Sequence, residues 1–256
     1  MAVSIDTVYQ KVLAFANKEQ RGYITPQEFN LFADQAQMEI FEQYFYDVNQ
    51  FKRIPGNDTV YSDVLTNLEE KISIFEAYDK TVSVVNEWGD IILGDDITDL
   101  YRLGMVRVDY NTEPRFRVAE QIQLHELNKY GTSPLGKWTK SRPVYTRYNT
   151  VGGRLDRIKI YPYPAESTIL NLNGDPLDRV RVSYLKNPFK PNWGYVVVNN
   201  KPLYNSNTST DFELHTAEES ELVYRILTYM GIAIEKPGLA QAAIGLETTK
   251  QQQEKQ

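Results

Sequence analysis

Apolar residues in the segment Thr25–Tyr46 recur three and four positions apart, which is the spacing of one face of an α-helix. The segment also has a helix start, because Thr25 and Glu28 can bond each other's backbone N–H groups and Pro26 suits the first helical position. A helix with one long apolar face cannot bury that face alone. The sequence therefore predicts a central helix here, with packing partners elsewhere in the chain.

Helical spacing is also found near both ends of the chain. Ser4–Asn17 precedes the central helix, and Ser62–Phe75 follows it as either a third helix or an irregular segment. Two more helices are expected, over Thr216–Ala233 and Leu239–Glu247. The simplest packing joins the helices of both ends in one bundle. The residues expected in its core are Phe29, Phe32, Ala36, Ile40, Leu222, Ile226 and Met230.

Between these helical regions the apolar period changes to two. Met105–Tyr110, for example, alternates Val106 and Val108 with Arg107 and Asp109, which indicates a strand with one buried face. Short turns separate several such runs, and this favours an antiparallel sheet folded as a sandwich or small barrel. The expected strands are Thr81–Val85, Ile91–Leu93, Met105–Tyr110, Val144–Tyr148, Leu155–Tyr161, Thr168–Leu172, Val180–Tyr184 and Tyr195–Val198.

Three other segments of this region are not expected to be strands. We expect a single helical turn in Asp96–Leu103, a short helix over Ala119–Lys129 and a polar linker over Lys201–Asp211. The predicted fold class is thus α+β, with N- and C-terminal helices in one bundle and a large antiparallel β insertion between them. The expected bounds of the three parts are 1–80, 81–210 and 211–256.

Composition narrows the classes of function. The chain is 41% hydrophobic and 24% charged, which is typical of a soluble globular protein. It holds no cysteine, which excludes disulfides, thiolate catalysis and cysteine-based zinc sites. The net charge of −6 does not favour a general affinity for nucleic acid. No run of about 18 apolar residues is present, and the N-terminus lacks the pattern of a secretory signal, so we expect no membrane association.

No motif of a known catalytic site is present. The chain has no glycine-rich phosphate loop, no Gly-x-Ser-x-Gly and no His-Glu-x-x-His. Of its two histidines, His125 lies on the segment expected as a short helix, where the adjacent Glu126 points elsewhere, and His215 lies just before a helix start. We expect a protein that is not an enzyme and has no cofactor, although a hydrolase acting through Asp and Glu remains an alternative.

Four aspartates form an acidic cluster that is a candidate metal site. Its spacing differs from that of a calcium-binding helix–loop–helix, and turn formation and helix capping explain it better, so no metal is expected. The cluster consists of Asp90, Asp95, Asp96 and Asp99.

Aromatic residues suggest two kinds of contact surface. Arginines that alternate with aromatic rings are typical of single-stranded nucleic-acid binding, but nearby acidic residues largely cancel their charge. These residues are Arg102, Arg107, Arg115, Arg117, Tyr101, Tyr110 and Phe116. Trp88 in a turn and Trp193 in a proline-rich loop are expected to be exposed, and with Tyr195 they form either a candidate interface with a neighbouring chain or small local cores.

Several segments spread over nearly the whole chain carry a family resemblance. They are ITPQEFNLFADQAQMEIFEQY at Ile24–Tyr44, DLYRLGMVRV at Asp99–Val108, SRPVYTRYN at Ser141–Asn149, IKIYPYP at Ile158–Pro164, VSYLKNPFKPNWGY at Val182–Tyr195 and ELVYRILTYMGIAIEKPGLAQ at Glu221–Gln241. In this order they resemble the head-to-tail connector proteins (adaptor, ring or tail tubular proteins) of short-tailed bacteriophages, including crAss-like phages. None of the segments is a catalytic signature.

The resemblance implies a structural protein of the virion that forms a homo-oligomeric ring in the phage neck, with a dodecamer as one possible stoichiometry. Its expected partners are copies of itself, the portal protein and the tail or ring proteins, and DNA would pass through the lumen without sequence-specific binding. A lumen that is not basic suits this role, because a basic wall would hold the phosphate backbone. The alternatives are another tail structural protein, such as a tube terminator or fibre adaptor, or a carbohydrate- or peptide-binding module.

Overall fold

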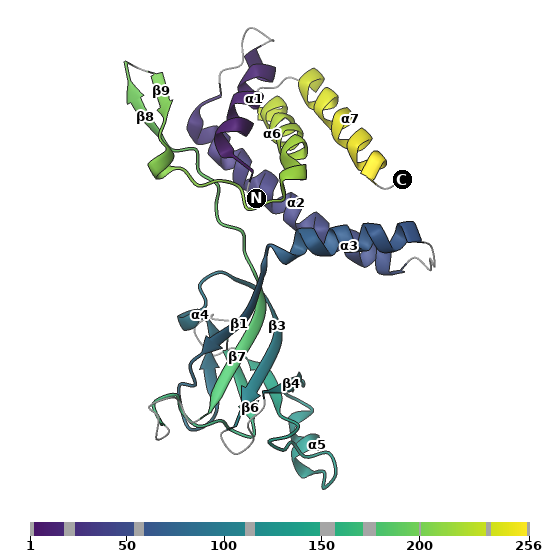
Figure 1. The fold of residues 1–256 in the computed structure, drawn as a ribbon, viewed down its shortest axis with the longest axis vertical. Helices are drawn as coiled ribbons and strands as arrows, with labels where there is room; N and C mark the ends of the chain where they lie inside the picture. Colours follow the sequence, from purple (N-terminus) through teal and green to yellow (C-terminus); the bar gives the residue numbers. More distant parts are fainter. Residues whose placement is uncertain are drawn as a thin grey trace. The chain divides into compact units, whose positions relative to one another are not determined.

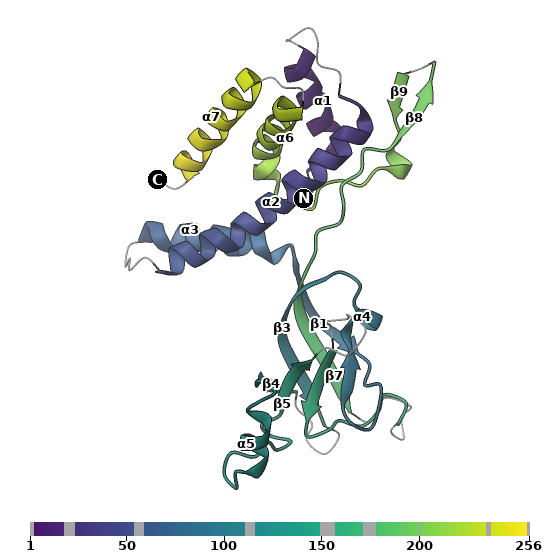
Figure 2. The same ribbon diagram turned by 180° about the vertical axis from the view of Figure 1, so that it is seen from behind.

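The computed structural model describes residues 3–17, 24–53, 59–110, 116–148, 157–170, 178–199, 201–233 and 237–254. The chain forms two compact units (Figures 1 and 2). Met1–Ile74 and Pro188–Gln256 make the helical unit, and Phe75–Asn187 makes the sheet unit. The predicted α+β class is confirmed. The sheet unit is shorter than the expected 81–210, because the chain after Asn187 returns to the helices.

The helical unit contains helices from both ends of the chain, as the apolar patterns predicted. Its centre is α6, which packs against α1, α2 and α7, while α3 packs on α2. The segment Thr25–Tyr46 lies within α2, which contacts α3 and α6 and reaches α1 through the rings of Phe29 and Tyr9. The elements are α1 (Ile5–Asn17), α2 (Pro26–Arg53), α3 (Thr59–Ser73), β8 (Tyr195–Val198), β9 (Lys201–Tyr204), η1 (Ser206–Thr208), η2 (Thr216–Glu218), α6 (Glu219–Ala233) and α7 (Pro237–Glu254).

The start of α2 has the expected reciprocal cap. The Glu28 N–H donates to Thr25 Oγ1 at 3.3 Å, and the Thr25 N–H donates to Glu28 Oε2 at 2.9 Å. These bonds, the backbone one foremost, lower the pKa of the Glu28 carboxyl. The cap fixes where α2 begins and which face it turns to the core.

The residues expected in the bundle core are placed in one packed interior, with one exception. Phe32 is only partly buried and stacks on Tyr229 of α6, with ring centroids 6.1 Å apart. It lies at the margin of the core because Ala33 and Ala36, its neighbours on α2, take the closest contact positions. The remaining six are fully buried: Phe29, Ala36, Ile40, Leu222, Ile226 and Met230.

A buried ionic cluster joins three helices of this unit. Arg225 of α6 donates through Nη2 to Glu221 Oε1 at 2.6 Å and through Nη1 to Glu39 Oε2 of α2 at 3.2 Å. It also bonds Gln43 of α2 and pairs with Glu247 of α7 at 3.3 Å. Burial acts to lower the pKa of the Arg225 guanidinium, but these carboxylates, Glu221 foremost, outweigh it and raise the pKa. The cluster fixes how α2, α6 and α7 pack.

The sheet unit is one curled sheet of seven strands in the order β1-β7-β3-β4-β5-β6-β2. Neighbours pair antiparallel except β4 and β5, which are parallel. A bridge between Val84, just after β1, and Ile91 of β2 links the two edges at one end, so the sheet approaches a small barrel. The elements are β1 (Glu76–Val82), β2 (Asp90–Ile92), α4 (Leu93–Asp96), β3 (Leu100–Asp109), β4 (Arg117–Gln121), α5 (Leu127–Thr132), β5 (Val144–Tyr148), β6 (Arg157–Tyr161) and β7 (Arg179–Lys186).

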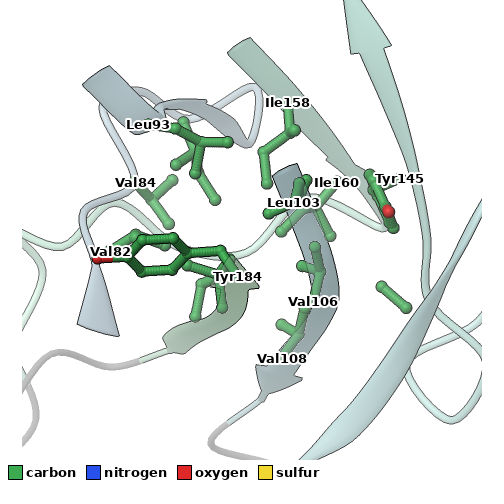
Figure 3. Packing of buried hydrophobic residues seen from close by; sticks show 14 of the residues in the cluster. Val82, Val84, Leu93, Leu103, Val106, Val108, Tyr145, Ile158, Ile160 and Tyr184 are labelled. Atoms are coloured by element: carbon green, nitrogen blue, oxygen red, sulfur yellow. The ribbon is translucent and has the colours of Figure 1, made fainter. Parts of the chain in front are cut away.

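The concave side of this sheet encloses an apolar core. Figure 3 shows side chains from several strands that meet inside the curl. Valines of β3 and β7 that alternate in sequence face each other there, such as Val106 with Val182 and Val108 with Val180. The strand period of two therefore sorts apolar side chains to the inside and charged ones to the outside.

Three sequence interpretations in and after this region are wrong. Ala119–Lys129 is not one helix: β4 occupies its first residues, because Ala119 pairs with Val106 of β3, and α5 begins only at Leu127. The single turn expected in Asp96–Leu103 is absent there, because the helical turn α4 ends at Asp96 and strand β3 begins at Leu100. The linker expected over Lys201–Asp211 holds β9. In each case pairing with a neighbouring strand overrides the local pattern.

Candidate interaction surfaces

The most unusual surface of the helical unit is a β-hairpin, β8–β9, which we call the arm. Tyr195 pairs with Tyr204 at its base, and Val198 pairs with Lys201 beside a two-residue connection. Asn199 in that connection has φ of 51°, the left-handed conformation that two-residue hairpin turns require. The arm makes a separate two-stranded sheet, so no further strand covers either edge in the described part of the chain.

The arm is apolar and exposed. Side chains that a folded monomer normally buries are open to solvent on both of its faces, and Val197 is 60% exposed. A two-stranded hairpin is at best marginally stable alone in water, and a contiguous exposed apolar patch marks an interaction site. The exposed residues are Val196, Val197, Val198, Leu203 and Tyr204.

Trp193 anchors the base of the arm to the helices. Its side chain is 2% exposed, so it forms a local core and the prediction that it is exposed is wrong. The indole packs on Tyr9 of α1 with centroids 4.1 Å apart, and Tyr195 and Tyr204 cover it at 5.9 and 5.8 Å. Its Nε1 donates to Asp6 Oδ1 at 2.9 Å. The tyrosines of the arm thus pack on a ring that α1 holds in place.

Backbone contacts fix the arm further. The Trp193 N–H donates to Asn30 Oδ1 of α2 at 2.7 Å, and Asn30 Nδ2 donates to Asn192 Oδ1 at 2.9 Å. The next residue, Gly194, lies so close to Thr208 that a Cβ there would stand 2.7 Å from the Thr208 carbonyl carbon. The arm is therefore held by both N-terminal helices, and its exposed end is pre-positioned.

A second surface, in the sheet unit, gathers around Trp88. Trp88 is 54% exposed, as its position in a turn predicted, and it meets Tyr163 edge-on with centroids 6.0 Å apart. Lys159 Nζ lies 5.4 Å from the Tyr163 ring centroid and 3.8 Å from Asp90 Oδ1. Asn86 Oδ1 accepts from the Trp88 N–H at 3.1 Å, which fixes the turn. This pair of rings is a stacking platform beside charged groups.

The outer face of the sheet carries a third cluster. Arg107 of β3 and Arg181 of β7 are direct cross-strand partners, and both pair with Asp79, which has φ of 64° at a bulge in β1. Burial acts to raise the pKa of the Asp79 carboxyl, but the bonds from Arg181 and Arg107 outweigh it and lower the pKa. Phe116 lies within 6 Å of both guanidiniums. One carboxylate thus holds the two guanidiniums together and balances one of their two charges.

This placement divides the alternating arginine and aromatic pattern. Tyr101 and Arg102 are exposed, whereas Tyr110 is buried and its hydroxyl donates to the Pro162 carbonyl at 2.6 Å. Arg107 is bound to Asp79, and Arg115 lies outside the described residues. The structure brings Arg107 and Phe116 together, but Asp79 pairs with that arginine and Tyr110 is buried, so the pattern does not form one exposed basic surface.

The acidic cluster is also divided. Asp96 Oδ2 accepts from the Ser83 N–H at 2.7 Å, and Asp90 and Asp99 accept tyrosine hydroxyls. In the described ranges no three His, Asp or Glu side chains are grouped as metal ligands. His215 caps η2, where its Nδ1 accepts from the Ala217 N–H at 3.2 Å. These side chains act in turns and caps.

Two tyrosine–aspartate bonds predict loss of stability in alkali. Tyr148 donates to Asp90 at 2.6 Å and Tyr184 donates to Asp99 at 3.0 Å. Burial, followed by the acceptor carboxylate, raises the pKa of each phenol from 10.0 to about 12. The folded state therefore keeps protons that the unfolded state loses, so this stability is complete below pH 10.0 and is lost as the pH rises to about 12.

The measurement is urea unfolding of the whole protein, monitored by circular dichroism at several pH values across this range. The double variant Tyr148→Phe, Tyr184→Phe should show a smaller alkaline loss than the parent, whereas Tyr78→Phe, at an exposed ring, should leave the loss unchanged. An equal loss in the double variant and the parent would contradict the assignment.

Comparison with models of known protein families and with curated proteins finds no match. Among the described residues no helix is long and apolar enough to cross a membrane. Only the geometry of the candidate surfaces therefore indicates what they could bind. The arm is the one that sequence reasoning missed, although the two asparagines between Tyr195–Val198 and Lys201–Tyr204 are a hairpin signal.

Proposed function

We propose that the protein is a non-enzymatic structural subunit of a bacteriophage virion, which assembles with copies of itself into a ring that connects portal and tail. The resemblance of its segments to head-to-tail connector proteins supports the phage neck as the place of this ring. The proposed assembly depends on a single observation, the arm, which is an apolar hairpin that is exposed at its end and fixed at its base.

An arm of this kind indicates an assembled state. Its exposed valines and leucine gain nothing in a monomer, yet Trp193 and Asn30 hold them in a defined position. Burial of apolar surface stabilises by about 25 cal/mol per Å², and a rigid base lowers the entropy lost on docking. A ring needs such a contact, since its subunits meet through two different surfaces.

The charges of the two units are compatible with a channel for DNA. The helical unit has 19 acidic and 12 basic residues, and the sheet unit has 15 acidic and 16 basic residues. Neither unit is strongly basic, so neither would hold the phosphate backbone by releasing many counterions. DNA would thus pass through the lumen of the ring without being retained.

Light scattering of the purified chain, alone and with the portal protein, tests this function. We expect a particle whose mass is a fixed multiple of the 29.6 kDa chain, either alone or on addition of portal. A chain that stays monomeric at high concentration and with portal present would contradict the proposal.

The platform at Trp88 and Tyr163 favours a second candidate function, a carbohydrate-binding module. An exposed ring can stack on the apolar face of a sugar, and Asp90 and Lys159 supply polar groups beside it. This candidate is favoured if the monomeric chain binds glycans and Trp88→Ala abolishes that binding, and it fails if glycan binding is absent.

A further inference from the structure

We infer that the arm of one copy docks on the exposed surface of α7 of the next copy, and that this contact closes the ring. The inference rests on the proposed function, and it names the two surfaces of the chain that meet.

The free surface of α7 is the first step. The face of α7 that carries Ala243 and Glu247 packs against α6, because Ala243 is buried and Glu247 pairs with Arg225 of α6. Ile244 and Leu246 lie on opposite flanks of the same helix, because two residues span about 200° of it, and each is about half exposed. A helix packed on one side with apolar residues left on its flanks has room for another partner.

The arm and α7 lie on different sides of the helical unit. In Figures 1 and 2 the arm projects on one side of α1 and α6, and α7 lies on the opposite side. An isologous dimer brings the same patch of both copies together, whereas a head-to-tail contact joins two different patches. Apolar surfaces on opposite sides of one unit suit the head-to-tail case, which forms a ring when the rotation between copies closes.

Charge complementarity identifies a second copy as the occupant. The segment that contains the arm, Pro188–Thr210, has two lysines and no acidic residue. The remainder of the helical unit has 19 acidic and 10 basic residues. Lys201 is the one charged side chain of the arm itself, so the arm is attracted to the acidic body of another copy of its own unit, and attraction of this kind steers encounter and selects the partner.

The register of the hairpin indicates which face docks. Val196 pairs with Leu203 and Val198 with Lys201, so these four side chains share one face, because side chains alternate along a strand. Tyr195 and Tyr204 are on the other face, which turns toward Trp193 at the base. The free face thus combines three apolar side chains with one lysine and suits an apolar site on an acidic body.

The edges of the arm are less suited to docking. Val198 and Lys201 close the two-residue turn, and Val197 pairs with Pro202 next to them. In this second pair the backbone N–H and C=O groups point away from the partner strand. Proline has no N–H, so the outward edge of β9 lacks a donor at its middle. The arm is therefore expected to dock through its face and not by adding a strand to β9.

Cross-linking tests the contact directly, since the chain has no native cysteine. Val196→Cys is mixed with Ile244→Cys or with Leu246→Cys under conditions in which the particle forms, and a short bis-maleimide is added. We expect a covalent dimer in at least one mixture and none from either variant alone. Val197→Cys, on the other face, is the matched control and should give several-fold less product.

Electron micrographs of the same samples separate the two proposals. Rings without cross-linked product would overturn the docking site and leave the proposed function standing, and so would equal product from Val196→Cys alone, which indicates contact between arms. Absence of any particle would overturn both. A double variant, Val196→Asp with Leu203→Asp, should prevent assembly while its thermal melting stays that of the parent, because both side chains are exposed in the monomer.

Discussion

Replacement of Arg225 by methionine is expected to lower the free energy of unfolding of the helical unit by about 3–5 kcal/mol. Arg225 is the only cation in the described cluster that faces Glu221, Glu39 and Glu247, and its side chain is 10% exposed. Without it, the Glu221 carboxylate, which is 5% exposed, loses the guanidinium from which it accepts hydrogen bonds. The three carboxylates then repel one another between α2, α6 and α7.

Urea unfolding followed by helical circular dichroism measures this effect. Lys11→Met is the matched control, because Lys11 pairs with Glu219 at 2.6 Å on the surface, where such pairs contribute about 0–1 kcal/mol. The double variant Arg225→Met, Glu221→Gln should regain part of the lost stability. If Arg225→Met unfolds within about 1 kcal/mol of the parent, where surface pairs lie, the cluster does not hold the helices together.

Replacement of Trp193 by alanine should cost about 3–5 kcal/mol, the usual range for a fully buried large aromatic residue. The change removes the ring that packs on Tyr9 and the donor to Asp6. It also leaves Tyr195 and Tyr204 without their support, so the arm loses its fixed base. Both stability and assembly are therefore expected to fall.

Trp88→Ala provides the comparison at the same residue type. Trp88 is 54% exposed, and its loss should change the melting temperature little. Limited proteolysis adds a local measurement: in Trp193→Ala, cleavage within the arm should be faster than in the parent. Equal proteolysis of the arm in the two proteins would show that Trp193 is not its anchor.

The sequence predicted the helical unit well because burial there follows a simple period. Phe29, Ala36 and Ile40 recur on one face of α2, and Leu222, Ile226 and Met230 do so on α6. Capping residues such as Thr25 and Glu28 act locally, so their partners can be read from spacing alone. Strands β3 and β7 were predicted for the same reason, since valine alternates with charge in both.

The burial of Trp193 at the base of the arm and the strand β4 were missed because long-range contacts define them. Trp193 is adjacent to prolines and glycine in a segment typical of a surface loop, yet Tyr9, Asp6 and Asn30 bury it from far away in the chain. Ala119 lies in a segment with helical spacing, and pairing with β3 on one side and β5 on the other makes that segment a strand. Neither partner could be inferred from local pattern.

In the proposed assembly the anchored arm joins copies of this chain in a closed ring. Electron-microscopic class averages of the purified assembly, with portal where it is needed, test that claim most directly. We predict end-on views with rotational symmetry around an open centre, in which each subunit touches two neighbours. Averages that show single chains, or pairs related by a two-fold axis, would contradict it.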